Sequence, residues 1–177
     1  MKIYFACTVR GDRAGVLAGR AVCGRLQALG HTVLTTHLVA DDVEDAEARL
    51  TEEAVFRRDL EWLAECDALV AEASGSSYGV GFEVGFVLGR AARTGQRVVL
   101  LYDAARRHQL SRLITGNCDA HCTTIGYRSI KELLSSVEQT MARLEEARAR
   151  EPQAETVEAG SVKTDATRPL TVLCEGD

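Results

Sequence analysis

Side chains that could carry chemistry gather behind an apolar run in the middle of the chain. Residues 68–73 (ALVAEA) have the composition of a buried strand, and the turn after them carries the hydroxyls of Ser76 and Ser77. Gly79 opens the next helix and lets its backbone approach a ligand closely, and Glu83 follows within about one turn. A helix N-terminus attracts anions and favours an ionised carboxylate. The pattern therefore predicts an anion-binding loop beside a reactive carboxylate, suited to a phosphorylated substrate.

The glycines of this turn do not form a standard nucleotide-binding motif. Gly79, Gly81 and Gly85 give G-x-G-x-x-x-G, one residue off the dinucleotide fingerprint, and they follow the third predicted strand rather than the first. The chain also contains no G-x-x-x-x-G-K-[ST] sequence. An NAD site and an NTP-hydrolysing P-loop are therefore not expected. The glycines could instead serve only to pack the helix against the sheet, but two serines and a carboxylate at the same turn favour a functional site.

Four other polar residues are candidates for the same site, and each also has an ordinary structural explanation. Asp59 lies beside the expected apolar stripe of a helix over 46–64, or is a solvated charge among its charged neighbours. Tyr4 alternates with apolar residues of the first strand and could be a half-buried sheet aromatic. Arg10 could meet a phosphate or a base, or be a loop charge. Ser111 could bond a phosphate, or cap a short helix.

The elements that would position these residues alternate between strand and helix. Apolar runs rich in β-formers predict five strands, at 2–7, 32–36, 68–73, 96–102 and 122–126. Helical periodicity predicts five helices, at 14–29, 46–64, 79–93, 108–115 and 128–150. The expected core stripes are Val16, Leu17, Ala21, Val22, Leu26 and Leu29 in the first helix and Phe56, Leu60 and Leu63 in the second. This order predicts a single-domain, doubly wound α/β fold of the flavodoxin or Rossmann-like kind, with a mostly parallel five-stranded sheet, helices on both faces and a ligand beyond the carboxyl ends of the strands.

Composition places this domain at 1–150 and leaves an acidic tail at 151–177. The chain has 177 residues, of which 46% are hydrophobic and 27% charged, as in an ordinary soluble enzyme. The tail holds both prolines, six acidic residues and two basic ones, so it carries −4 of the net charge of −5. We expect it to be disordered or loosely docked. The negative net charge argues against a nucleic-acid polymer as partner but not against a single nucleotide.

Neither a membrane nor a metal is expected. No run approaches the roughly 18 apolar residues of a membrane span. The first five residues enter a strand directly, which predicts no signal peptide and a cytoplasmic location. Six cysteines are scattered without paired CxxC spacing. Cys118, His121 and Cys122 resemble a metal site faintly, but no second cluster completes a set of four ligands, so we expect neither metal nor cofactor.

Several segments form a recognisable set: SSYGVGFEVG at 76–85, RDLEWL at 58–63, IYF at 3–5, VRG at 9–11, VLT at 33–35 with His37, and Leu110, Ser111, Ile114 and Gly116. Together they resemble one enzyme family, the 2'-deoxynucleoside 5'-phosphate N-hydrolases of the nucleoside 2-deoxyribosyltransferase superfamily. The resemblance covers about residues 2–117 and leaves out the terminal helix and the tail.

This resemblance implies hydrolysis of the N-glycosidic bond of a nucleoside 5'-monophosphate. The family's nucleophilic glutamate falls on Glu83, which would form a glycosyl ester at C1' before water releases a (deoxy)ribose 5-phosphate. Its acid/base aspartate falls on Asp59, and its orienting tyrosine falls on Tyr4. The other substrate-binding positions fall on Cys7, Thr8, Val9, Arg10, Gly11, Ser77, Gly79 and Ser111. Thr8, Ser77, Gly79 and Ser111 would contact the phosphate, with Ser111 supplied by the second subunit of a homodimer.

Departures from the family pattern leave more than one activity open. Cys7 and Thr8 replace the usual Gly and Ser, Phe82 replaces Tyr and Ser76 replaces Pro. Tyr4 at the sugar-sensing position favours deoxyribose, whereas some related enzymes cleave ribonucleotides such as CMP. The chain could instead be a deoxyribosyltransferase that exchanges bases, or a nucleotide-binding module without turnover.

Overall fold

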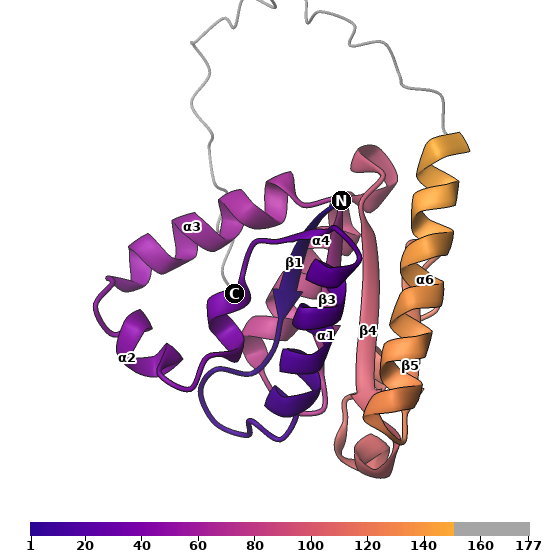
Figure 1. Ribbon diagram of the computed structural model, residues 1–177. Coiled ribbons are helices and arrows are strands. Elements are labelled where there is room, and N and C mark those ends of the chain that lie inside the picture. The colour runs from indigo at the N-terminus through magenta and orange to yellow at the C-terminus, as the bar shows by residue number, and fades with distance from the viewer. Residues whose placement is uncertain (151–177) are drawn as a thin grey trace, which may run out of the picture.

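The computed structural model describes residues 1–150, so the predicted tail at 151–177 lies outside the described residues. Figure 1 shows helices packed along a central sheet. The strands of the sheet are β1 Lys2–Ala6, β2 Thr32–Val33, β3 Ala68–Glu72, β4 Arg97–Asp103 and β5 Cys122–Tyr127. The α-helices are α1 Val16–Ala28, α2 Val43–Glu47, α3 Glu52–Glu65, α4 Tyr78–Thr94, α5 Arg112–Thr115 and α6 Ile130–Arg150, and two 3₁₀ helices are η1 Thr36–Val39 and η2 Ala104–Gln109.

All five strands of the sheet are parallel, in the order β2-β1-β3-β4-β5. This arrangement confirms the predicted α/β class and makes the sheet fully rather than mostly parallel. The direction in which strands are added reverses between the neighbouring strands β1 and β3, where Tyr4 pairs with Leu69. In flavodoxin-like sheets of this order, ligands bind at the carboxyl ends of the strands beside that reversal. The fold therefore places a binding crevice after Ala6 and Glu72.

Two apolar layers cover the two faces of the sheet. On one face α1 and α6 pack over Phe5, Val70 and Leu101. On the other face α3 and α4 pack over Tyr4 and Leu69. Side chains on successive strand residues point to opposite faces, so Tyr4 and Phe5 belong to different layers. Tyr4 consequently lies on the side of the sheet that α3 and α4 cover.

The predicted core stripe of the first helix is partly wrong. Leu17 is 69% exposed and Leu29 is also exposed, whereas Gly19 and Cys23 are buried. A Cβ at Gly19 would come within 2.8 Å of the Phe5 ring, so the small residue allows α1 to pack closely on the sheet. Val22 and Leu26 are buried as predicted, and small residues, which hydrophobic periodicity does not detect, complete the buried face.

The second strand is shorter than predicted because a side chain replaces its backbone pairing. Pairing with β1 stops at Val33, followed only by a bond from the Leu34 amide to the Ile3 carbonyl. The Thr35 hydroxyl then accepts from the Phe5 amide at 2.9 Å and donates to the Phe5 carbonyl at 2.6 Å. Because the Thr35 side chain satisfies both the amide and the carbonyl of Phe5, the chain leaves the strand here and continues as η1.

The single helix predicted over 46–64 is two helices, α2 and α3. Thr51 ends the intervening segment, and its hydroxyl accepts a hydrogen bond from the Ala54 amide at 3.1 Å. This N-cap and the acidic residues after it are a recognisable helix start. Phe56 is 53% exposed rather than in the core, whereas Leu63 is buried as predicted.

The segment after β4 is also more helical and more broken than predicted. The helix predicted at 108–115 is replaced by η2, which begins at Ala104, and the four-residue α5. Asp103 starts η2 by accepting from the Ala105 amide at 2.9 Å. The longest helix is α6, and within residues 1–150 no helix combines the length and apolarity needed to cross a bilayer.

Candidate active site

A cavity of about 690 Å³ opens at the carboxyl ends of β1 and β3, between α3 and α4. Its lining brings together residues that the sequence separates widely, including Cys7, Asp59, Ser77 and Glu83. The position matches the crevice beside the reversal of strand order. Its volume lies in the range of small-molecule pockets.

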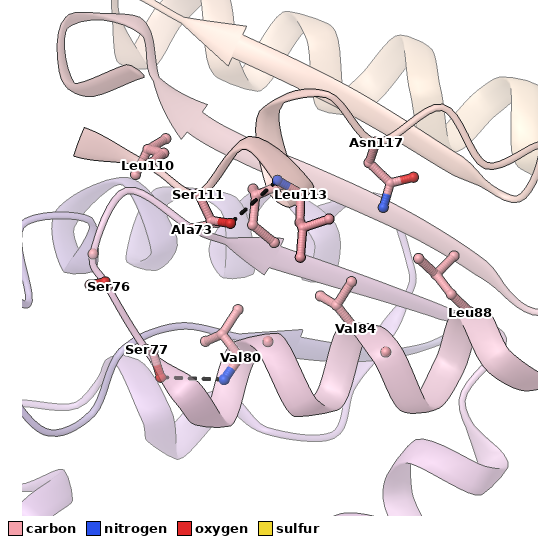
Figure 2. A pocket seen from close by; sticks show the side chains of 14 residues that line it. Ala73, Ser76, Ser77, Val80, Val84, Leu88, Leu110, Ser111, Leu113 and Asn117 are labelled. Atoms are coloured by element: carbon pink, nitrogen blue, oxygen red, sulfur yellow. Dashed lines mark hydrogen bonds between the residues drawn. The ribbon is translucent and has the colours of Figure 1, made fainter. Parts of the chain in front are cut away.

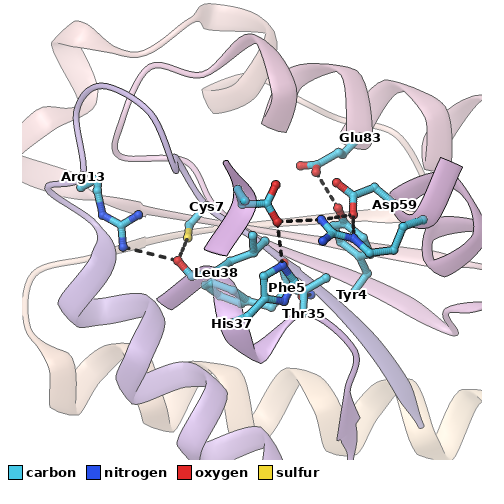
Figure 3. Close-up of polar contacts among 11 residues, drawn as sticks. Tyr4, Phe5, Cys7, Arg13, Thr35, His37, Leu38, Asp59 and Glu83 are labelled. Atoms are coloured by element: carbon cyan, nitrogen blue, oxygen red, sulfur yellow. Dashed lines mark hydrogen bonds and ion pairs between the residues drawn. The ribbon is translucent and has the colours of Figure 1, made fainter. Parts of the chain in front are cut away.

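Glu83 is fixed by a hydrogen bond from the sheet. The Tyr4 hydroxyl donates to Glu83 Oε1 at 2.7 Å (Figure 3). Tyr4 is fully buried on β1, so its ring cannot swing away. Burial together with the nearby carboxylates of Glu83 and Asp59 raises the pKa of the Tyr4 phenol, which keeps it a donor. Among residues 1–150 no hydrogen bond reaches the other carboxylate oxygen, Glu83 Oε2.

The expectation that the helix N-terminus would keep Glu83 ionised is not met. Glu83 lies in the second turn of α4, and the first turn carries no acidic residue. Burial raises the pKa of Glu83 to about 7, the charge of Asp59 adds to that effect, and the hydrogen bond from Tyr4 opposes it. Burial disfavours the charged form of a carboxyl group. At neutral pH, Glu83 is therefore divided between the protonated acid and the carboxylate.

Asp59 lies across the same cavity on α3 and is held by Arg58. The Nε of Arg58 donates to Asp59 Oδ1 at 2.9 Å, and its Nη2 donates to Glu47 Oε1 at 2.9 Å. The guanidinium lies 4.9 Å from the centroid of the Trp62 ring. Burial raises the pKa of Asp59, and the adjacent guanidinium opposes that rise. Figure 3 shows the Asp59 and Glu83 side chains close to Tyr4.

The loop after β1 places some of its predicted site residues in the cavity lining and others outside it. Cys7, Val9 and Arg10 line the cavity, and Cys7 Sγ donates to the Leu38 carbonyl at 3.7 Å. Thr8 is buried outside that lining, and its hydroxyl has no hydrogen-bond partner among residues 1–150. Gly11 also lies outside the lining and has φ = +99°, a conformation that glycine adopts without strain. The structure thus brings three of these five predicted residues to the cavity.

The first turn of α4 forms the edge of the cavity, as the glycine and serine pattern predicted. Ser77 is the N-cap, and its hydroxyl oxygen accepts from the Val80 amide at 3.3 Å. A hydroxyl that accepts in a cap keeps its own hydrogen free to donate. Gly79 lines the cavity beside Ser77. Both residues therefore stand where an anion would meet a helix N-terminus.

Ser111 lies apart from this cavity, in a second one of about 380 Å³ (Figure 2). It caps α5 by accepting from the Leu113 amide at 3.3 Å. Ser77 lines both cavities, so α4 separates them at its first turn. Within one chain, Ser111 does not line the cavity that holds Glu83 and Asp59.

Sequence reasoning assigned no site role to several residues of the cavity wall. Phe56 and Phe82 lie on neighbouring helices with ring centroids 6.3 Å apart, and both line the cavity. Glu47 also lines it and lies 3.3 Å from His37 Nε2. Phe56 was predicted as core because its spacing fits a helical stripe, and Glu47 carried no motif. Aromatic faces of this kind can stack on a planar base.

Cys118, His121 and Cys122, which faintly resemble a metal site in the sequence, do not gather as ligands in the part of the chain that the structure describes. Within the described 150 residues, no group of three or more His, Cys, Asp or Glu side chains is arranged to hold an ion. His121 instead lies against Asp119, with Nδ1 3.2 Å from Oδ1. Cys118 and Cys122 are free thiols.

The chain is similar to known proteins in sequence and in fold. Residues 3–122 match the family described as nucleoside 2-deoxyribosyltransferase. A Thermofilum pendens protein provisionally named 2'-deoxynucleoside 5'-phosphate N-hydrolase 1 is 37% identical over 138 residues, covering 78% of this chain and 93% of that protein. The 5-hydroxymethyl-dUMP N-hydrolase of Danio rerio is 36% identical over 117 residues, covering 66% of this chain and 78% of that protein. A CMP N-glycosidase structure from Clostridium botulinum has the same fold, with a TM-score of 0.58 at 18% identity, covering 79% of this chain and 99% of that one. The chain belongs to the nucleoside 2-deoxyribosyltransferase family.

Proposed function

We propose that this protein hydrolyses the N-glycosidic bond of (2'-deoxy)nucleoside 5'-monophosphates, releasing the free base and (deoxy)ribose 5-phosphate. The observation that carries the proposal is the pair of carboxylates in one cavity: Glu83, fixed by Tyr4 at 2.7 Å, and Asp59 on the facing helix. The relatives named as N-hydrolases of 2'-deoxynucleoside 5'-phosphates and of 5-hydroxymethyl-dUMP support the same reaction.

The proposed reaction has two steps through a covalent intermediate. In the first, the ionised Glu83 attacks C1' of the sugar, the C1'–N bond breaks, and its electron pair leaves with the base, which takes a proton from Asp59. In the second, Asp59 takes a proton from water as the water oxygen attacks C1', and the glycosyl ester on Glu83 breaks. Two carboxyl groups sharing covalent attack and proton transfer are the pattern of retaining glycosidases. Tyr4 keeps one oxygen of Glu83 in place while the other attacks.

The phosphate is proposed to lie at the first turn of α4. There the Ser77 hydroxyl can donate, and the backbone at Gly79 faces the cavity. Thr8 is proposed to contact the phosphate as well, although its buried hydroxyl, which has no partner among residues 1–150, lies outside the lining of this cavity. Cys7, Val9, Arg10 and Gly11 would border the sugar and phosphate.

We further propose a homodimer in which Ser111 reaches the partner's phosphate. Ser111 does not line the main cavity of its own chain, and its neighbour Leu113 is 83% exposed. Light scattering should give twice the chain mass, and Ser111→Ala should raise KM for the monophosphate. A monomer with full turnover would contradict this assembly.

A cytoplasmic location is proposed on the chemistry of the cysteines and the substrate. Cys7, Cys23, Cys66, Cys118 and Cys122 are free thiols, which persist in reducing compartments.

The net charge of −5 suits a small nucleotide held in a local pocket better than a nucleic-acid polymer. Neither a metal nor a cofactor takes part in the proposed steps.

The first experiment is to incubate the protein with a panel of deoxyribo- and ribonucleoside monophosphates and chromatograph the released bases. We expect base release from monophosphates and hardly any from nucleosides, and loss of release in Glu83→Ala. Glu61→Gln, an exposed carboxylate on α3, is the matched control and should keep wild-type turnover. Near-wild-type activity of Glu83→Ala would rule out the mechanism.

The same panel separates the rival activities. Adding a second free base and finding an exchanged nucleotide would show a deoxyribosyltransferase. Preferential release from CMP would show a ribonucleotide hydrolase. Tight binding without release of any base would show a nucleotide-binding module.

A further inference from the structure

Arg58 makes an unusual contact with its sequence neighbour. Both residues lie on α3, where adjacent side chains point about 100° apart and do not normally face each other. Arg58 nevertheless turns so that Nε and Nη2 both lie 2.9 Å from Asp59 Oδ1. Because the geometry of the helix does not by itself bring Arg58 onto Asp59, other groups must hold Arg58 in this position.

Two groups from outside that contact hold the guanidinium. Glu47 on α2 accepts from Nη2 at 2.9 Å, and its side chain is only 13% exposed. The Trp62 ring lies one turn along α3 with its centroid 4.9 Å from the guanidinium carbon, a distance at which cations bind aromatic faces. Glu47, Arg58, Trp62 and Asp59 therefore form one connected cluster beside the cavity.

We propose that Arg58, anchored by Glu47 and Trp62, is a positioning residue that fixes the Asp59 carboxylate for proton transfer at the scissile bond. The inference rests on the proposed function, because it assumes that Asp59 is the group that exchanges the proton. It adds a role for a side chain that does not line the cavity itself.

The contact determines which oxygen of Asp59 carries the proton. A guanidinium only donates hydrogen bonds; Arg58 Nε donates to Oδ1, and the cationic Nη2 lies 2.9 Å from the same oxygen. A proton on Oδ1 would face this donor and this positive charge, so the acid form carries its proton on Oδ2. That oxygen gives the proton to the leaving base and later takes one from water.

Arg58 also balances the charge around Asp59. Glu47 on α2 raises the pKa of Asp59, as burial does, whereas His37 on η1 lowers it. Glu83 on α4 adds a further carboxylate to the same cavity, and Arg10 lines it from the loop after β1. Without Arg58, little would oppose the rise in the pKa of Asp59 that burial and Glu47 cause. Asp59 would then hold its proton to higher pH and activate water poorly.

The test compares Arg58→Gln with Arg57→Gln. Arg57 is the preceding residue, pairs with Glu53 at 2.6 Å and is largely exposed, so it is a matched control on the solvent face of α3. Activity is measured as kcat and KM across pH on the best monophosphate of the panel. In parallel, the carboxyl carbon of Asp59 is titrated by NMR in ¹³C-labelled protein and assigned with Asp59→Asn.

We expect Arg58→Gln to lower kcat about 10–100-fold, part of the 10²–10⁴ that general acid–base catalysis supplies, with KM little changed. The Asp59 titration and the pH limb that follows it should both move to higher pH. Arg58→Lys should restore the titration but only part of kcat, because an ammonium keeps the charge without the planar fork. Arg57→Gln should match the wild type, and circular dichroism should show all three variants folded.

The proposal is overturned if Arg58→Gln leaves the Asp59 titration unmoved, or if its loss appears in KM alone. It is also overturned if Arg57→Gln shows the same loss, because the effect would then be that of any charge on α3. Failure of the proposed function looks different, since the wild type would then release no base from any monophosphate. The NMR titration does not depend on turnover and would still decide whether Arg58 controls Asp59.

Discussion

Replacing Glu83 with glutamine should stabilise the protein above neutral pH while it removes turnover. Burial raises the pKa of Glu83 to about 7 from 4.5 in the unfolded chain. Between these two values the folded state binds more protons than the unfolded state, so the free energy of unfolding falls as pH rises. A pKa difference of this size corresponds, at about 1.4 kcal/mol per unit, to at most about 3 kcal/mol. Glutamine keeps the shape and the bond from Tyr4 but does not ionise.

Urea unfolding of wild type and Glu83→Gln measures this effect directly. The stability gain of the variant should be below about 1 kcal/mol at about pH 5 and should approach about 3 kcal/mol at about pH 8.5. Glu61→Gln replaces an exposed carboxylate of α3, so its curve should follow the wild type at both pH values. A gain that is equal at both pH values would refute the reasoning, because it would show that the ionisation of Glu83 costs no folding energy.

Two further predictions concern contacts described above. Tyr4→Phe removes the hydrogen bond that lowers the pKa of Glu83, so the acidic limb of the profile of kcat/KM against pH should move to higher pH, and chemical denaturation should show a loss of about 1 kcal/mol. An unmoved limb would contradict the role given to Tyr4. Gly75→Ala should lower the free energy of unfolding by about 1–3 kcal/mol, since a Cβ there would overlap the backbone oxygen of Asp12. Gly24→Ala, within α1 and with open space around it, should instead gain about 0.5–1 kcal/mol, and equal effects at both glycines would refute the packing argument.

The sequence was most informative where one physical signal dominated. The apolar run at 68–73 indicated a strand buried on both faces, and the serines and glycines after it indicated the start of a helix, so β3 and α4 were predicted within a residue or two. The alternation of such units led to the parallel sheet and to the crevice that Glu83 faces.

Other features depended on contacts that a linear pattern does not contain. Phe56 fits an apolar stripe, yet its side chain lines the cavity instead of packing in the core. Thr8 and Cys7 are neighbours in the sequence, yet only Cys7 lines the cavity. The pKa of Glu83 follows from its burial, which exists only once the sheet and helices have assembled. Thr51 was the one missed signal that sequence reasoning could have found, since a threonine before two glutamates is a common helix start.

The fully parallel sheet has a consequence for how the chain is made. Parallel neighbouring strands cannot be joined by a tight hairpin. Ile3 of β1 therefore pairs with Ala68 of β3 only after the whole connection between them has been made. Contacts between distant parts of a chain slow folding. During synthesis, the centre of the sheet cannot close until Asp103 has left the ribosome. Until β3 has been made, Tyr4 and its neighbours on β1 lack one of their two partner strands and expose apolar surface, which makes the early part of translation the period of greatest risk of aggregation.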